Sequence, residues 1–121
     1  MPNNHVQEGG VIQYTNGGSA LSSGDPIVIG ELIGVCLVDI ANGATGSVAI
    51  EGVFNLAKVD AAVIAQGESV IWDASAGAFD DNAAIPATGD VSGCCQAMEA
   101  KGATTGETIA VKLNVGVGTV A

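Results

Sequence analysis

The stretch that decides the fold is TIAVKLNV, residues 108–115. Large aliphatic residues occupy every second position, and smaller or polar residues occupy the others: Ile109, Val111, Leu113 and Val115 against Thr108, Ala110, Lys112 and Asn114. Because successive side chains of a strand point to opposite faces, this pattern predicts an antiparallel strand with one buried face. We therefore expect an all-β protein.

Further segments have the composition of strands and are bounded by turn-forming residues: Val11–Thr15, Pro26–Ile29, Leu32–Ile40, Ser47–Leu56, Ser69–Asp73, Ala78–Asp80 and Gly93–Glu99. Gly52 interrupts the alternation within the fourth of these segments, which predicts a bulge or a sharp bend there. Residues 58–65 could form a helix of at most two turns. Residues 80–90 are expected to be an exposed loop that Pro86 stiffens.

The length of 121 residues allows one domain. We expect a small antiparallel β-barrel or β-tulip-like domain over residues 11–121, preceded by a polar N-terminal arm, residues 1–10, and containing at most one short helix. Only four residues are aromatic, namely Tyr14, Phe54, Trp72 and Phe79, although 48% of the chain is hydrophobic. The core is therefore expected to consist mainly of Val, Ile, Leu and Ala.

A weak internal repeat relates the two halves of the chain. Three pairs of segments match in the same order: 24–29 with 67–72, 34–45 with 93–104, and 49–51 with 110–112. Each half would then contain a hairpin, a long strand, a Gly-Ala-Thr turn and a closing strand. Such a repeat predicts a pseudo-symmetric barrel, although the 18 glycines make chance matches easy.

The charge of the chain argues against several classes of partner. The chain contains thirteen acidic residues, three lysines and no arginine, which gives a formal net charge of -10. Binding of nucleic acid requires a basic stripe, and the same negative field repels anionic lipid headgroups. We therefore expect no direct nucleic-acid contact and no membrane association. No apolar run has the ~18 residues of a membrane span, and the N-terminus lacks a basic and apolar leader, so a soluble, cytosolic origin is expected.

Residues that could carry catalysis are scarce. The single histidine, His5, lies in the N-terminal arm, so it is not expected to activate a nucleophile. No lysine lies in a phosphate-binding loop. The cluster Asp80-Asp81-Asn82 lacks the later glutamate of a calcium loop, so a hydrated turn is favoured over a weak ion site. We expect no enzyme activity, no cofactor and no bound metal.

The three cysteines, Cys36, Cys94 and Cys95, are an odd number without the spacing of a zinc site. Neighbouring residues of a regular strand point to opposite faces, so Cys94 and Cys95 are expected to diverge. We interpret all three as small buried hydrophobic residues in a reducing compartment.

Trp72 has two interpretations. A core position is favoured, and an anchor in an interface is the alternative. Trp72 or Tyr14 could also line a sugar-binding groove, although a platform for stacking sugars would need more aromatic groups than these two. A ligand-binding or carbohydrate-binding β module of a phage or cell-surface structure is therefore the alternative function.

Several longer motifs together resemble one family: QEGGVIQYT, SGDPIVIGELIGVCLVD, GSVAIEGVFNLAK, AAVIAQGESVIWDASAGAF and TGETIAVKLN. Over residues 6–114 the chain is similar to the capsid cement, or head-decoration, proteins of tailed bacteriophages and prophages. A GVF-x-L-x-K strand followed about a dozen residues later by a G-x-x-V-x-W-D hairpin is the moderately specific part.

The resemblance implies a structural virion protein that binds the exterior of the mature capsid and cements the major capsid protein, stabilising the DNA-filled head. It also implies synthesis in the host bacterial cytoplasm and a homo-oligomer, with a trimer preferred and a dimer as the alternative. No catalytic residue accompanies the resemblance. For contacts with the capsid or with another subunit we expect the arm residues Pro2, Asn3, Asn4, His5 and Val6, together with Trp72.

Overall fold

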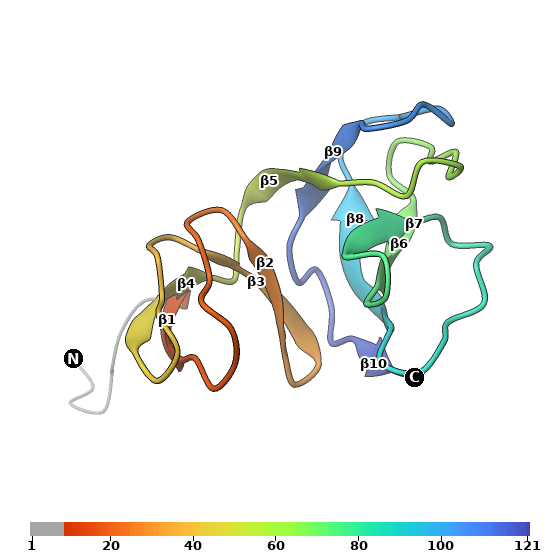
Figure 1. Ribbon diagram of the computed structural model, residues 1–121. Helices are drawn as coiled ribbons and strands as arrows, with labels where there is room; N and C mark the ends of the chain where they lie inside the picture. Colours follow the sequence, from red (N-terminus) through yellow and green to blue (C-terminus); the bar gives the residue numbers. More distant parts are fainter. Residues whose placement is uncertain (1–8) are drawn as a thin grey trace, which may run out of the picture.

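The computed structural model describes residues 9–121, and this part of the chain consists of strands, turns and irregular segments without a helix (Figure 1). The strands are β1 (Val11–Thr15), β2 (Pro26–Ile29), β3 (Leu32–Cys36), β4 (Thr45–Ala49), β5 (Val53–Ala57), β6 (Ser69–Asp73), β7 (Ala78–Asp80), β8 (Val91–Ala97), β9 (Thr108–Lys112) and β10 (Thr119–Val120). All strands expected from the sequence are present, although several end earlier than expected, and β10 was not expected. In residues 9–121 we find no helical segment with the length and hydrophobicity of a membrane span.

The strands form two antiparallel sheets. The first has the order β1-β4-β3-β2, and the second has the order β5-β9-β8-β6-β7, with β10 pairing additionally to β8. The sheets lie side by side and do not close into a barrel (Figure 1). The all-β expectation is confirmed, and of its two forms the open, β-tulip-like one corresponds to this arrangement.

Gly52 is the point at which the chain passes from the first sheet to the second. One strand was expected over residues 47–56, but β4 ends at Ala49 and β5 begins at Val53. Gly52 has φ +114°, a conformation that residues with a side chain rarely adopt. The predicted bend is therefore confirmed, and it separates two strands that belong to different sheets.

The two sheets repeat one strand order, because β5-β9-β8-β6 follows the same path as β1-β4-β3-β2. Where β2 meets β3 and β6 meets β8, the residues matched by the sequence repeat are also paired in the same way. Ile29 lies opposite Leu32, and the equivalent residue Trp72 lies opposite Val91. Farther along they differ: the matched residues would place Ala110 against Cys94, but Ala110 accepts a hydrogen bond from Met98. The halves are thus alike in topology without sharing one register.

The second half carries an insertion. Gly30 and Glu31 alone join β2 to β3, whereas β7 and residues 81–90 separate β6 from β8. We call residues 81–90 the tip loop. Figure 1 shows it extending from the second sheet, away from the first.

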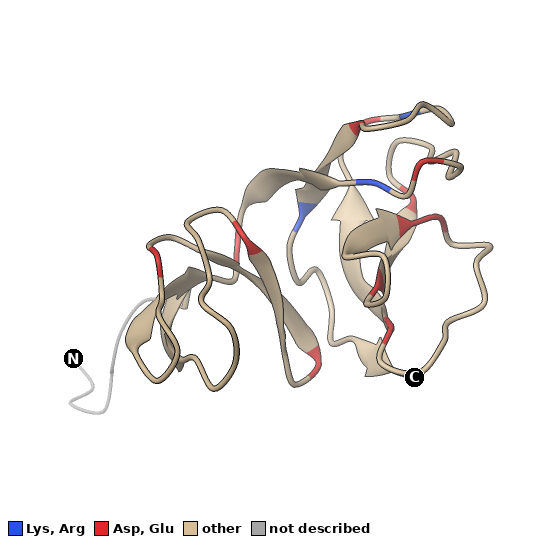
Figure 2. Ribbon diagram, viewed as in Figure 1, with Lys and Arg blue, Asp and Glu red and all other residues tan. Residues whose placement is uncertain are grey.

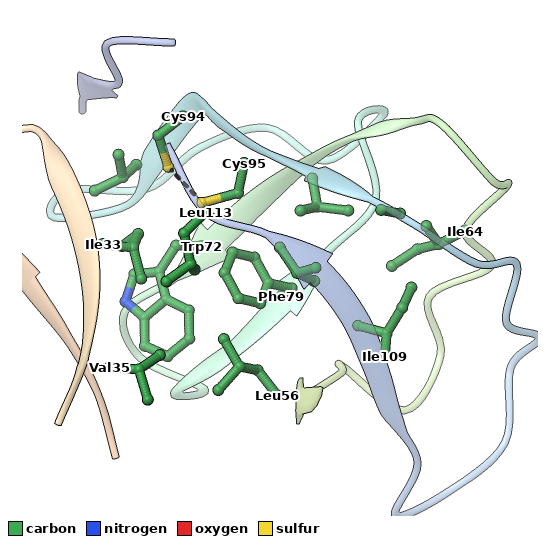
Figure 3. Close-up of a cluster of buried hydrophobic side chains, with 14 of the residues drawn as sticks. Ile33, Val35, Leu56, Ile64, Trp72, Phe79, Cys94, Cys95, Ile109 and Leu113 are labelled. Carbon is green, nitrogen blue, oxygen red and sulfur yellow. Dashed lines mark hydrogen bonds between the residues drawn. The ribbon is translucent and has the colours of Figure 1, made fainter. Parts of the chain in front are cut away.

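The larger hydrophobic core lies against the second sheet, and the first sheet contributes to it through Ile33 and Val35 of β3. Figure 3 shows these two side chains beside Trp72. A smaller cluster lies within the first half and comprises the buried residues Cys36, Ile40 and Val48 with partly buried neighbours. Strand β3 is therefore shared between the two cores, which joins the sheets into one unit.

Asn114 forms a polar link between the two sheets. Its Oδ1 accepts a hydrogen bond from the Ile33 amide at 3.0 Å, and its Nδ2 donates to the carbonyl oxygens of Ile33 and Ile50 at 2.7 and 2.8 Å. Asn114 has φ 53°, a left-handed conformation that asparagine tolerates better than most residues. This conformation explains why the expected strand 108–115 ends at Lys112.

Candidate docking surfaces

The potential catalytic residues are not brought together. Residues 9–121 hold no group of three or more His, Cys, Asp or Glu side chains arranged to bind a metal ion. The three cysteines are buried, and His5 lies outside the described residues. What the structure does expose is a set of apolar side chains, so its candidate functional features are surfaces for contact.

The acidic cluster Asp80-Asp81-Asn82 is engaged in shaping the chain. Asp80 Oδ1 accepts from the amide of Asp81 at 2.8 Å, and Asp81 Oδ1 accepts from the amide of Ala83 at 2.9 Å. The amide of Asn82 donates to Glu68 Oε2 at 3.0 Å. The cluster is thus a hydrogen-bonded turn, the interpretation that the sequence favoured.

The expected divergence of Cys94 and Cys95 is wrong. Both residues are 0% exposed and lie in the larger core, with their Sγ atoms 3.2 Å apart (Figure 3). The register between β6 and β8 shifts here, and Gly93 has φ +81°. A bulge of this kind interrupts the two-residue alternation of a strand, so both side chains turn to the same face.

Trp72 lies in the core. It is 6% exposed, and its ring meets that of Phe79 edge to face with centroids 5.1 Å apart. An indole buried in this way leaves little surface for a partner or a sugar, which favours the core interpretation over the anchor. The carbohydrate-binding alternative thereby loses one of its two stacking groups.

Charge is distributed unevenly between the two sheets. Acidic residues occur around both sheets, whereas the lysines lie around the second sheet (Figure 2). Lys58 is buried, and Lys101 lies 3.3 Å from Glu99. Within residues 9–121 no basic stripe results, so the expectation that nucleic acid is not a partner stays a prediction with a physical basis.

The tip loop is held in shape by side-chain hydrogen bonds. Asp90 is buried at its base, where Oδ1 accepts from the Ala74 amide at 3.0 Å and Oδ2 accepts from the Ala87 amide at 2.9 Å. The amide of Gly89 donates to the carbonyl of Ala121 at 2.9 Å. These bonds attach the end of the loop, at Gly89 and Asp90, to Ala121 and Ala74, and the bond from Ala87 to Asp90 closes a turn within the loop.

At the outer part of this loop Ile85 is 92% exposed and precedes Pro86. Single exposed aliphatic residues are common on protein surfaces. Ile85 differs because it sits on a loop with ordered hydrogen bonds and beside a proline, so little conformational entropy would be lost when a partner covers it. It is a candidate anchor for a partner.

A second apolar surface is formed by residues 114–121, which we call the C-terminal strap. It contains no charged residue, and Val115, Val117 and Val120 are exposed, Val117 to 80%. Between the strap and the β2–β3 turn lies a hollow of about 350 Å³, lined by Glu31, Leu32, Asn114, Gly116 and Val117. The strap therefore offers both a projecting valine and a recess at the junction of the sheets.

The sequence-based contact residues and the exposed surfaces do not coincide. Pro2, Asn3, Asn4, His5 and Val6 lie outside the described residues, so their role in contacts stays a prediction. Ile85 and the strap were not singled out from the sequence. The signals available were an isoleucine next to proline in a polar loop and an uncharged, valine-containing end, both of which are weak on their own.

Comparison with known proteins relates this architecture to one protein family. Over residues 6–113 the sequence matches the family described as phage cement protein, whereas the search of curated proteins found no match. The matched range contains β1 to β9, so it covers both sheets and the tip loop. Proteins of this family have a structural role associated with the phage capsid. The chain thus belongs to the phage cement protein family, as its sequence motifs indicated.

Proposed function

We propose that this protein binds the outer surface of the mature phage capsid, bridges neighbouring subunits of the major capsid protein and stabilises the DNA-filled head. The observation that carries the proposal is the family match over residues 6–113. The structure supports it by offering apolar contact surfaces, among them Ile85 and the C-terminal strap.

Stabilisation by such a protein needs no chemistry. A ligand that binds the mature lattice but not its precursor stabilises the mature lattice by mass action, and the effect is repeated at each site. The accessible surface of this chain is 6444 Å², so a single copy can bury only a limited area against a capsid. Assembly into a homo-oligomer, a trimer in preference to a dimer, would add avidity.

We assign the tip loop to contact with the major capsid protein. Ile85 is the most exposed large apolar residue within residues 9–121, and hydrogen bonds that the carboxylates of Asp90 and Glu68 accept from main-chain amides preorganise the loop that presents it. Apolar side chains that become fully covered dominate the binding energy of protein interfaces. The arm residues Pro2–Val6 are assigned to the same capsid surface, as the sequence suggested.

The test is a pelleting experiment with purified capsids that lack the protein. Wild-type protein should pellet with expanded capsids and much less with unexpanded ones. Ile85→Ser should weaken binding to expanded capsids by about tenfold or more, as expected for loss of an interface anchor. Val63→Ser, which changes another exposed aliphatic residue outside the tip loop, is the matched control and should bind normally.

One further variant completes the experiment. Deletion of residues 2–8 should leave the oligomer intact and weaken capsid binding. Absence of the wild-type protein from both pellets would overturn the proposed function, and binding to a glycan array in the same preparations would support the carbohydrate-binding alternative. Normal binding of Ile85→Ser would refute only the role of the tip loop.

A further inference from the structure

The adjacent cysteines form a site that capsid binding does not require. Cys94 and Cys95 place their Sγ atoms 3.2 Å apart, whereas the third cysteine, Cys36, belongs to the smaller cluster in the first half. A disulfide bond is about 2.05 Å long, so the two sulfurs would need to approach by about 1.2 Å, and because adjacent Cα atoms are only about 3.8 Å apart the bond would be strained and readily reduced. The bulge at Gly93 already turns both side chains to one side.

The two thiols are not equivalent. A hydrogen bond with Cys94 lowers the pKa of Cys95, and the main-chain N–H of Asn114 contributes in the same direction while burial opposes it. The same sulfur–sulfur hydrogen bond, followed by burial, raises the pKa of Cys94. Because the thiolate is the nucleophilic form of cysteine, Cys95 is the member of the pair suited to react first.

The C-terminal strap covers this pair. A Cβ atom at Gly118 would lie 3.2 Å from Cys94 Cβ, 2.5 Å from Val91 Cγ1 and 2.6 Å from the carbonyl oxygen of Glu31. The strap is held by a hydrogen bond from the Gly118 amide to Glu31 O at 3.1 Å, by the two-residue pairing of β10 with β8, and at Ala121 by main-chain hydrogen bonds with Gly89 and Asp90 at 2.9 Å. Such a short pairing makes the strap suited to local opening, through which a small reagent can reach the sulfurs.

We propose that Cys94 and Cys95 are a site of reversible oxidation, at which a small hydroperoxide converts the thiol pair into a disulfide between adjacent residues. The Cys95 thiolate attacks one oxygen of hydrogen peroxide, the O–O bond breaks, and the leaving hydroxide takes up the former Cys95 proton as water. Cys95 is then a sulfenic acid. The Cys94 sulfur attacks the Cys95 sulfur, the S–O bond breaks, and the departing oxygen leaves as a second water with the Cys94 proton. The two sulfurs supply the two electrons that reduce the peroxide.

The first test counts thiols. Native protein is treated with hydrogen peroxide, denatured without reductant and alkylated. Wild-type protein should decrease in mass by about 2 Da at the Cys94–Cys95 peptide and keep Cys36 as its single alkylated thiol, and dithiothreitol should restore all three thiols. Sulfinic or sulfonic products at Cys94 or Cys95, or oxidation of Cys36 at the same rate as the pair, would overturn the proposal.

The second test removes each sulfur in turn. In Cys94→Ala the sulfenic acid at Cys95 has no resolving partner, so the trapping reagent dimedone should label it. Cys95→Ala likewise lacks a resolving partner at Cys94, and neither variant should form the disulfide. Cys36→Ala is the control and should form the disulfide like the wild type. If either alanine variant is unfolded by circular dichroism, the wild-type thiol count decides the proposal.

A third test asks whether the reagent reaches the two cysteines beneath the strap. Gly118→Ala must displace the strap, because its new methyl group would meet Val91 and the Glu31 carbonyl at distances below contact. We expect the disulfide to form at least about threefold faster in this variant. Gly102→Ala adds the same methyl group where nothing lies within 4 Å, and its rate should equal that of the wild type. Equal rates in the two variants would refute entry beneath the strap.

Discussion

The two sheets of this protein follow one strand order but are stabilised in different ways. The first sheet has a cluster of three buried residues, Cys36, Ile40 and Val48, with partly buried neighbours around it. The second has the larger core, to which the inserted β7 contributes Phe79, a 0% exposed ring against Trp72. A single strand order therefore accommodates both a small cluster and a large core, and the inserted β7 adds one large ring to the latter.

The two halves also hold the loop that follows their first strand with different buried polar residues. Asn16 follows β1 and Lys58 follows β5, and both are buried polar residues. Asn16 Nδ2 donates to the carbonyls of Ser19 and Ile40, while Lys58 Nζ donates to those of Val59, Asp60 and Ala62. Each side chain holds the loop that leaves the edge strand. We call such a buried polar side chain that holds a loop a clamp. The two halves thus place a clamp at the corresponding position, but its donor is an amide in the first half and an ammonium group in the second.

Removal of Phe79 should have the largest effect on stability. Phe79→Ala deletes a fully buried ring and its contact with Trp72, so the free energy of unfolding should fall by about 3–5 kcal/mol. Ile40→Ala, the matching truncation in the small cluster, should cost about 2–4 kcal/mol. Urea unfolding followed by circular dichroism measures both.

The same titrations test whether the halves are independent. Because Ile33 and Val35 of the first sheet pack in the core of the second, both variants should unfold in one transition. A separate early transition in Ile40→Ala would show that the first sheet unfolds by itself, and the shared role of β3 would then be rejected.

The link at Asn114 should have the next largest effect. Asn114→Ala removes three hydrogen bonds between the sheets and places alanine at φ 53°, so we expect a loss of about 2–4 kcal/mol. Asn114→Gly removes the same bonds but tolerates the backbone conformation, and should lose about 1 kcal/mol less. Denaturant midpoints of the two variants separate the contributions, and equal midpoints would mean that backbone conformation plays no part.

Lys58 tests the repeated clamp. Lys58→Met keeps much of the aliphatic stem and removes this donor from the carbonyl oxygens of Asp60 and Ala62, whereas Val59 O keeps the Ala62 amide as a donor; the expected cost is about 2–3 kcal/mol. Lys101→Met removes a partly exposed ion pair with Glu99 and should cost less than about 1 kcal/mol. Thermal unfolding of both variants provides the measurement. A loss no larger in Lys58→Met than in Lys101→Met would refute the clamp.

Local patterns predicted much of this fold. Alternation identified β9, turn-forming residues delimited β2, β6 and β7, and Gly52 marked the bend between the sheets. These features depend on neighbouring residues, which is why sequence reasoning reaches them. The longer motifs likewise indicated the family, because they extend over residues of both sheets.

The remaining features depend on long-range contacts. Strand β10 has two residues and exists because β8 supplies its partner. Cys94 and Cys95 share a face because a bulge between β6 and β8 overrides the alternation. Similarly, the exposure of Ile85 follows from where the tip loop is attached, through Asp90. No pattern of adjacent residues contains this information.

The smallest predicted effect concerns the turn that joins β6 to β7. Asp73 Oδ1 accepts from Ser75 Oγ at 2.8 Å and from the amides of Ser75 and Ala76 at 3.1 Å. The bond from the Ser75 hydroxyl, followed by that from the Ala76 amide, lowers the pKa of Asp73. A carboxyl group whose pKa is lowered by folding contributes stability that is complete above its unfolded pKa, about 3.9, and is lost as the pH falls through its folded pKa.

Wild-type protein should therefore lose slightly more stability than Asp73→Asn when the pH falls from about 5 to about 2, a range that spans the unfolded pKa. The difference should be less than about 1 kcal/mol, because solvent screens this turn. Urea midpoints across this pH range give the comparison. Parallel curves for wild type and Asp73→Asn would mean that the hydrogen bonds to Asp73 Oδ1 add no pH-dependent stability to this turn.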